Sequence, residues 1–113
     1  MKHSKATERV MHKNSATTTA YEYDTGSSVI NGALITIAGR YPESGWALNT
    51  HSTSLIHVTK GGGVALFDRN SIDLASDDEL LIEPDEKYAF EGDMTILYVA
   101  TPAWTTDQAE HRE

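Results

Sequence analysis

Residues 44–63, SGWALNTHSTSLIHVTKGGG, decide how this chain folds and raise its main chemical question. The part from Ser54 to Lys60 is rich in apolar and β-branched residues, which is typical of a β-strand. Two histidines, His51 and His57, stand ahead of three consecutive glycines. Because paired histidines are common metal ligands, the first question is whether these two bind a metal.

Short runs of β-branched and aromatic residues recur on both sides of this segment, separated by residues that favour turns. Strands are predicted at 18–23, 29–38, 45–50, 54–60, 63–68, 71–74, 79–83, 86–91 and 94–100. Gly61, Gly62 and Gly63 are expected to form a turn between two strands, and Asp68-Arg69-Asn70-Ser71 is expected to close a hairpin. No amphipathic helix is predicted before the C-terminal tail, so the sequence indicates an all-β protein.

Length and composition limit the class of protein. The chain has 113 residues, of which 39% are hydrophobic, enough for one domain with a core. We expect a polar, flexible N-terminal segment at 1–16, a barrel at 17–104 and a polar tail at 105–113, with one helical turn capped by Thr105 or Thr106. The chain has no cysteine, which excludes disulfides, a thiolate zinc site and a catalytic cysteine.

The charge and hydropathy of the chain limit its partners and location. Its net charge is −8, with many acids between residues 77 and 93, and such a surface repels nucleic acid. No run of apolar residues is long enough to span a membrane, and the N-terminus lacks the apolar core of a signal peptide. We therefore expect no nucleic-acid or membrane partner and a cytoplasmic location.

The order of these features resembles the cupin family, whose members are double-stranded β-helix, or jelly-roll, barrels. The resemblance rests on GRYPESG at 39–45, on VTKGGG at 58–63, on the hairpin and on SDDELLIEPDEKYAFEGD at 76–93. GRYPESGW together with TPAWTTDQ at 101–108 resembles a subgroup of small, single-domain bacterial cupins that lack the metal motif. The resemblance implies an all-β cupin barrel with a short polar N-terminal segment, and a homodimer to which the strand at 17–23 contributes.

In cupins, two short motifs supply three histidines and a glutamate to a metal. Placing the closing glycine of the first motif on Gly61 puts its glutamate position at Ser54, and its histidine positions near Ala47 and Asn49 or one residue later. The histidine position of the second motif falls on Tyr88. Because a neutral amide, a hydroxyl and a phenol are poor ligands for iron, manganese or zinc, we expect neither a metal nor another cofactor.

Strand alternation predicts the position of His57 but not that of His51. If Ser54 points inward, Ile56 and Val58 do so too, and His57 points outward. His51 lies in a segment where a bend can break this alternation, so it is either a loop residue or an acid/base group at the barrel mouth. The two histidines are not expected to form a metal pair, because no third ligand matches them.

Five residues are expected to line a pocket for a small polar molecule, with Tyr88 as the best candidate: Trp46, Asn49, Ser54, Tyr88 and Phe90. Tyr88 is either a ligand contact or a core tyrosine, and Trp104 is expected to close one end of the barrel.

Three hypotheses for function remain open. The first is a metal-independent cupin that binds a sugar derivative or another metabolite. The second is a metal-free isomerase, epimerase or cyclase that uses His51 and Tyr88 as acid and base. The third is a structural or regulatory module, which requires a filled barrel without a pocket of roughly 300 Å³.

Overall fold

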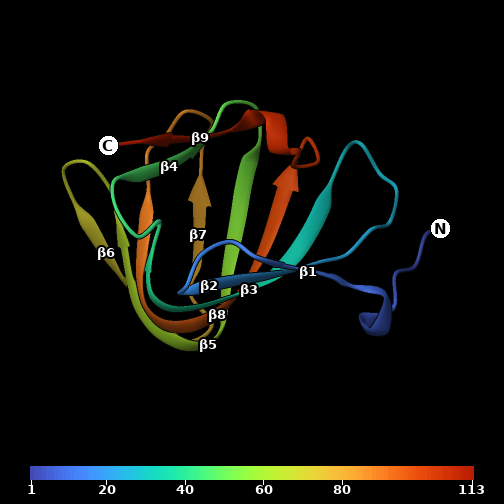
Figure 1. Ribbon diagram of the computed structural model, residues 1–113, viewed down its shortest axis with the longest axis horizontal. Helices are drawn as coiled ribbons and strands as arrows, with labels where there is room; N and C mark the ends of the chain where they lie inside the picture. Colours follow the sequence, from blue (N-terminus) through green and yellow to red (C-terminus); the bar gives the residue numbers. More distant parts are fainter.

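The computed structural model describes residues 1–113, and nearly all of its regular structure consists of β-strands (Figure 1). The strands are β1 (Val10–Lys13), β2 (Thr18–Glu22), β3 (Asn31–Tyr41), β4 (Trp46–Asn49), β5 (Thr53–Leu66), β6 (Ser71–Leu74), β7 (Glu79–Ile82), β8 (Ala89–Thr101) and β9 (Ala109–Arg112). Two short 3₁₀ turns, Ala6–Glu8 and Thr106–Gln108, are the only helical segments. No helix is long and apolar enough to cross a membrane.

The strands form a strongly curved antiparallel sheet with a two-stranded ribbon across it. The sheet has the order β1-β2-β3-β8-β5-β6, and β7 pairs with the first part of β5. Figure 1 shows β3, β5 and β8 curving along the bottom of the barrel and the ribbon of β4 and β9 crossing its top. Backbone bonds between Ala47 and Tyr88 tie the ribbon to the rest of the barrel. The all-β jelly-roll prediction is confirmed.

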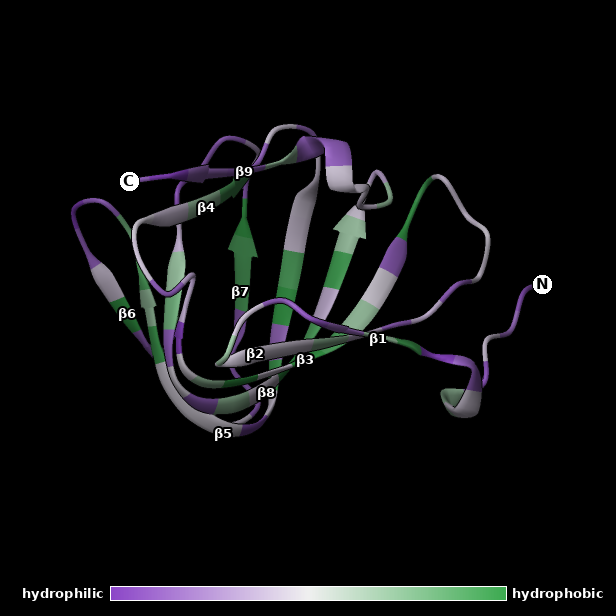
Figure 2. Cartoon of the chain, in the orientation of Figure 1, coloured by the Kyte–Doolittle hydropathy of each residue, from purple (hydrophilic) through white to green (hydrophobic).

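The alternation predicted for the first part of β5 is also confirmed. Ser54, Ile56 and Val58 are buried, whereas His57 lies on the outer surface of the sheet. Its ring contacts the carboxylates of Glu79 at 3.1 Å and Asp77 at 3.4 Å. Hydrophobic residues concentrate on the strands of the large sheet, and both ends of the chain are largely hydrophilic (Figure 2).

The three glycines do not form the predicted turn. Gly61 to Gly63 lie inside β5, which runs without interruption from Thr53 to Leu66 beside β8. Gly61 has a φ of 79°, and a Cβ atom there would collide with the carbonyl oxygen of Asp93 in β8. The glycines are therefore needed because the two strands bend together at very close range, not because the chain reverses.

A glycine also explains why another pair of predicted strands is continuous in the structure. The predicted strands 86–91 and 94–100 are joined into β8, because Gly92 allows the strand to bend without ending. The Asp68-Arg69-Asn70-Ser71 hairpin is confirmed by the pairing of β5 with β6 and by the bond from the Phe67 amide to the Asn70 carbonyl, 2.8 Å.

Both polar ends of the chain contribute strands. Val10–Lys13, within the segment predicted to be flexible, forms β1 against β2. Ala109–Arg112, within the predicted tail, forms β9 against β4, after the turn at Thr106–Gln108. Because these strands lie at the edge and surface of the barrel, they need few apolar residues, and the sequence therefore shows no alternating hydrophobic pattern there.

Candidate functional site

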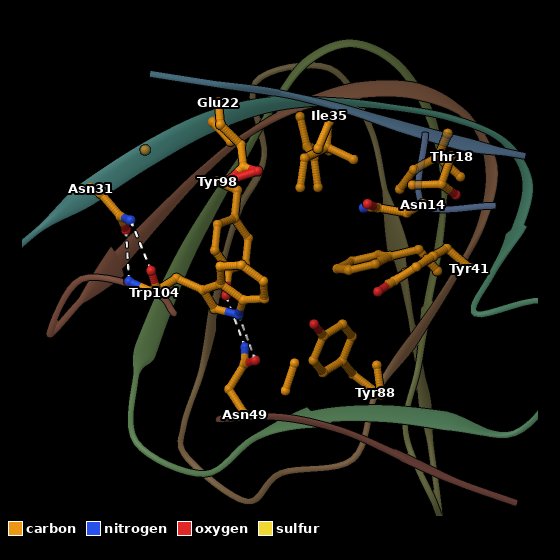
Figure 3. Close-up of a pocket in the computed structure, with 18 of the residues that line it drawn as sticks. Asn14, Thr18, Glu22, Asn31, Ile35, Tyr41, Asn49, Tyr88, Tyr98 and Trp104 are labelled. Carbon is orange, nitrogen blue, oxygen red and sulfur yellow. Dashed lines mark hydrogen bonds between the residues drawn. The ribbon is translucent and has the colours of Figure 1, made fainter. Parts of the chain in front are cut away.

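A cavity of about 140 Å³ lies between the curved sheet and the ribbon of β4 and β9. Most of the residues that line it are hydrophobic, and its aromatic members come from five places: Tyr23 after β2, Tyr41 at the end of β3, Tyr88 before β8, Phe90 and Tyr98 on β8, and Trp104 after it. Figure 3 shows Tyr41 and Tyr88 on one side of the cavity and Trp104 and Tyr98 on the other. The barrel is therefore not completely filled, although this cavity alone is smaller than the roughly 300 Å³ that small-molecule sites need.

One wall of the cavity is held by a chain of hydrogen bonds. The Trp104 indole Nε1 donates to Asn49 Oδ1 at 2.9 Å, and Asn49 Nδ2 donates to the Tyr98 hydroxyl at 2.9 Å. Ser54 Oγ lies 2.7 Å from the same hydroxyl. We name these residues, Asn49, Ser54, Tyr98 and Trp104, the inner cluster. Because every member has a partner, the buried polar atoms are satisfied without a charge.

Asn31 fixes the position of Trp104. Its Nδ2 donates to the Trp104 carbonyl at 3.1 Å, and its Oδ1 accepts from the Trp104 amide at 2.8 Å. This two-bond clamp places the indole over the cavity, where Trp104 helps to line one end, in keeping with the expectation from the sequence.

The hydroxyls of Tyr88 and Tyr41 differ from that of Tyr98. Tyr88 is only 7% exposed and has the Asn49 side chain nearby, but Asn49 bonds at ordinary hydrogen-bond distances to Trp104 and Tyr98 and not to Tyr88. The hydroxyl of Tyr41 has no hydrogen-bond partner within the chain, and both residues line the cavity. In Figure 3 both hydroxyls point toward the empty centre. Since buried phenols normally find a partner, these two are available to a bound molecule.

Burial keeps these phenols neutral. It raises the pKa of Tyr88 well above its usual value, the neighbouring Tyr98 and Tyr41 raise that pKa further, and Asn49 opposes the rise. Burial likewise raises the pKa of Tyr41. At neutral pH both side chains are therefore hydrogen-bond donors or acceptors rather than bases.

The structure brings together three of the five residues predicted to form the pocket. Asn49, Tyr88 and Phe90 line the cavity, with the Tyr88 and Phe90 ring centroids 5.5 Å apart. Ser54 supports Tyr98 from behind, outside the lining. Trp46 does not line the cavity either, and its ring lies under the guanidinium of Arg40 at 5.9 Å.

His51 lies outside the cavity. It is exposed, and its Nδ1 lies 2.8 Å from the hydroxyl of its neighbour Thr50. Because Tyr88 lines the cavity and His51 does not, the structure does not bring this suggested acid/base pair together.

Cupins often hold a metal ion, but the residues at the corresponding positions here do not fit one. Asn49 bonds to Trp104 through Oδ1 and to Tyr98 through Nδ2, and Ser54 bonds to Tyr98. No group of three or more histidine, aspartate and glutamate side chains is arranged to hold a metal ion anywhere in the chain. The donors are neutral oxygens and an amide, which divalent transition metals bind poorly.

Sequence reasoning missed Tyr98, Tyr41 and Glu22, which also face the cavity. Tyr98 carried a usable signal, because it alternates with the inward residues Ile96 and Ala100 on β8. Glu22 also follows inward residues at a spacing of two, along β2. Tyr41 is the last residue of β3 and stands at even spacing from the inward residues Ile35 and Ile37, so alternation carried a signal for it too.

Structural similarity to known proteins supports the fold, whereas sequence comparison finds no match. No protein-family pattern and no curated protein matches the chain. Pac13 of Streptomyces, a nucleoside dehydratase whose variant was solved with uridine, superposes with a TM-score of 0.88 at 14% identity, covering 98% of this chain and 90% of that one.

Two further solved structures are similar. The polyketide cyclase RemF of Streptomyces resistomycificus has a TM-score of 0.71 at 14% identity, covering 90% of this chain and 80% of its own. A cupin-2 domain from Rhodospirillum rubrum has a TM-score of 0.71 at 14% identity, covering 93% of this chain and 74% of its own. Together with the curved antiparallel sheet and the cavity inside it, these similarities show that the protein has the cupin fold.

Proposed function

We propose that the protein binds a small, polar, ring-containing molecule of the nucleoside type in this cavity, without a metal. The observation that carries the proposal is the pair of unpartnered phenol hydroxyls, Tyr41 and Tyr88, that face the cavity. A carbonyl or hydroxyl of a ligand would satisfy both, and the apolar walls would cover its ring.

The inner cluster supports this proposal by making one wall rigid. Trp104 and Tyr98 are held in place by Asn49, so their ring faces are available to a planar ligand without a further cost for ordering them. Uridine in structures of Pac13 variants, one of which replaces tyrosine by phenylalanine, shows that a cupin of this shape accepts a nucleoside.

Titration with uridine, followed by calorimetry and by the fluorescence of Trp104 in a Trp46→Phe background, tests the proposal. Uridine is expected to bind saturably, and Tyr88→Phe is expected to weaken binding about fivefold because one hydrogen bond is lost. Tyr21→Phe is the matched control, since Tyr21 lies under Arg9 on the outer surface. Absence of saturable binding, or equal losses in both variants, would refute the proposal.

Metal independence is tested separately. Protein purified without a chelator is expected to contain far less than one equivalent of iron, manganese, nickel or zinc, because the donors are unsuitable. Stoichiometric metal that disappears in Asn49→Ala or Tyr88→Phe would contradict metal independence.

The chain is also expected to form a homodimer. Within one chain, β2 pairs with β1 on one side and β3 on the other, so its edges are already used. Leu55, Leu81 and Leu97 are exposed on the outer surface of the sheet, and a second copy would cover them. Sedimentation velocity is expected to give twice the chain mass of 12.4 kDa, and a monomer at micromolar concentration would refute this expectation.

A further inference from the structure

A second, more open pocket of about 270 Å³ adjoins the cavity. Glu22, Tyr23 and Asn31 line both spaces, so a molecule in the cavity can extend into this outer pocket. Only the outer pocket is lined by His12, from β1, and by the loop residues that follow Tyr23. The cavity is mainly apolar, whereas the outer pocket is mainly polar.

Glu22 stands at the junction of the two spaces. It follows Thr18 and Ala20 on the inward surface of β2, and strand pairing places it in one row with Ala33 and Tyr98. Figure 3 shows its side chain at the rim of the cavity, close to Tyr98. One carboxylate oxygen contacts His12 Nε2 at 3.2 Å, which leaves the other oxygen for a ligand.

The charged groups that line the two spaces are acidic apart from His12. Neither space is lined by a lysine or an arginine. Glu110 also lines the cavity but forms an ion pair with Arg112, and Asp24 in the outer pocket accepts a bond from the Gly26 amide. Glu22 is therefore the carboxylate at the junction whose charge no arginine or lysine neutralises.

The two nearby cations bond to residues of the outer pocket without lining it. Lys2 Nζ donates to the Gly26 carbonyl at 3.3 Å. The guanidinium of Arg9 lies over the rings of Tyr21 and Tyr23 and donates to the Ala6 carbonyl and to the Tyr23 hydroxyl, the latter at 3.4 Å. Neither residue lines either pocket, so an anionic group beside Glu22 would meet a carboxylate without a compensating cation.

We propose that Glu22 selects the charge of the ligand: its outer end is a neutral or cationic hydrogen-bond donor, such as a hydroxyl or an ammonium group, and its phosphorylated form is rejected. This inference rests on the proposed function, because the ring must lie in the cavity beside the unpartnered, 7% exposed Tyr88 for its substituent to reach Glu22. A carboxylate only accepts hydrogen bonds, and it repels a phosphate.

Three probes that differ at one substituent test the inference: uridine, 5′-amino-5′-deoxyuridine and uridine 5′-monophosphate. At low ionic strength and about pH 8, the amine is expected to bind about threefold more tightly than uridine and the phosphate about fivefold more weakly, because the Glu22 side chain is 37% exposed and solvent screens its charge. In Glu22→Gln, which keeps the size of the side chain, the affinity ratio of amine to phosphate is expected to fall at least about tenfold while uridine still binds.

Asp73→Asn is the matched control. It removes the same charge from an exposed position on β6 that lines neither pocket, and it should leave the ratio unchanged. If none of the probes binds, the proposed function fails. If uridine binds but the phosphate binds equally well, or if Glu22→Gln and Asp73→Asn change the ratio equally, the role of Glu22 is refuted while nucleoside binding stands.

Discussion

Two polar clusters meet on the same strand, β5, and differ in almost every physical respect. The inner cluster contains Ser54 and consists of neutral groups, with the Tyr98 hydroxyl shared between Asn49 and Ser54. The outer cluster consists of His57, Asp77 and Glu79, whose side chains are 33%, 87% and 56% exposed. Three positions along a strand thus separate a buried uncharged network from a solvated charged one.

The difference shows what burial demands of polar residues. A charge inside the barrel would lose its hydration, so the interior uses amide, hydroxyl and indole groups that satisfy one another. On the outside, water and salt weaken the attraction between His57 and its two carboxylate partners, so this contact contributes little to stability. The following experiments test this contrast.

The largest effect is expected from two neighbouring apolar residues on opposite surfaces of β5. Ile56 is 0% exposed and Leu55 is 39% exposed. In a single subunit, Ile56→Ala should lower the free energy of unfolding by about 3 to 4 kcal/mol, because it leaves a cavity in the core, whereas Leu55→Ala should lower it by less than about 1 kcal/mol. Urea denaturation followed by circular dichroism, at protein concentrations low enough to dissociate the expected dimer, measures both, and similar losses would contradict the outward position of Leu55.

A smaller effect is expected from removing single phenol hydroxyls. Tyr98→Phe leaves Asn49 Nδ2 and Ser54 Oγ without their shared partner and should destabilise the fold by about 2 kcal/mol. Tyr41→Phe removes a hydroxyl with no partner in the chain and should change stability by less than about 0.5 kcal/mol. Equal losses of unfolding free energy in urea denaturation would contradict the claim that the hydrogen bonds of the inner cluster stabilise the fold.

The smallest effect is expected at the outer cluster and depends on pH. The hydrogen bond with Glu79 raises the pKa of His57, partial desolvation opposes this rise, and the bond with Asp77 adds to it. Because the folded pKa is raised, the contribution to stability is complete below the ordinary histidine pKa of about 6.5 and is lost as the pH rises through the folded pKa.

Comparison with His57→Gln isolates this contribution. The difference in the free energy of unfolding between wild type and variant should shrink as the pH is raised from about 5 to about 9. A difference that grows with pH, or a His57 pKa below that of a free histidine in an NMR titration, would contradict the assignment.

Local patterns predicted the barrel well. Alternation along β5 placed Ser54 and Ile56 inside and His57 outside, because successive side chains on a strand point to opposite surfaces. The same reasoning fails where the backbone itself is close-packed. Gly61 indicated a turn by its residue type, and only the neighbouring strand β8 explains why a glycine is needed inside a strand.

The site was predicted in part. Replacement of the cupin ligand positions by Asn49, Ser54 and Tyr88 indicated a neutral pocket, and the structure places Asn49 and Tyr88 in the cavity lining. Trp46 belongs to the right strand but points elsewhere, and Glu22 comes from a strand that the motifs do not include. Motif register alone therefore identifies some of the lining and none of the junction with the outer pocket.

By itself, the sequence determined the β-class of the fold, the side on which residues lie in the first part of β5, and the loss of the metal ligands. These properties depend on residue type and on alternation along one strand, which are local. Only the tertiary structure decided that Asn49 meets Trp104 across 55 residues, and that the hydroxyl of Tyr88 stays free while that of Tyr98 does not. Such outcomes depend on how strands that are distant in the sequence pack around a shared cavity. A local sequence pattern does not contain that information.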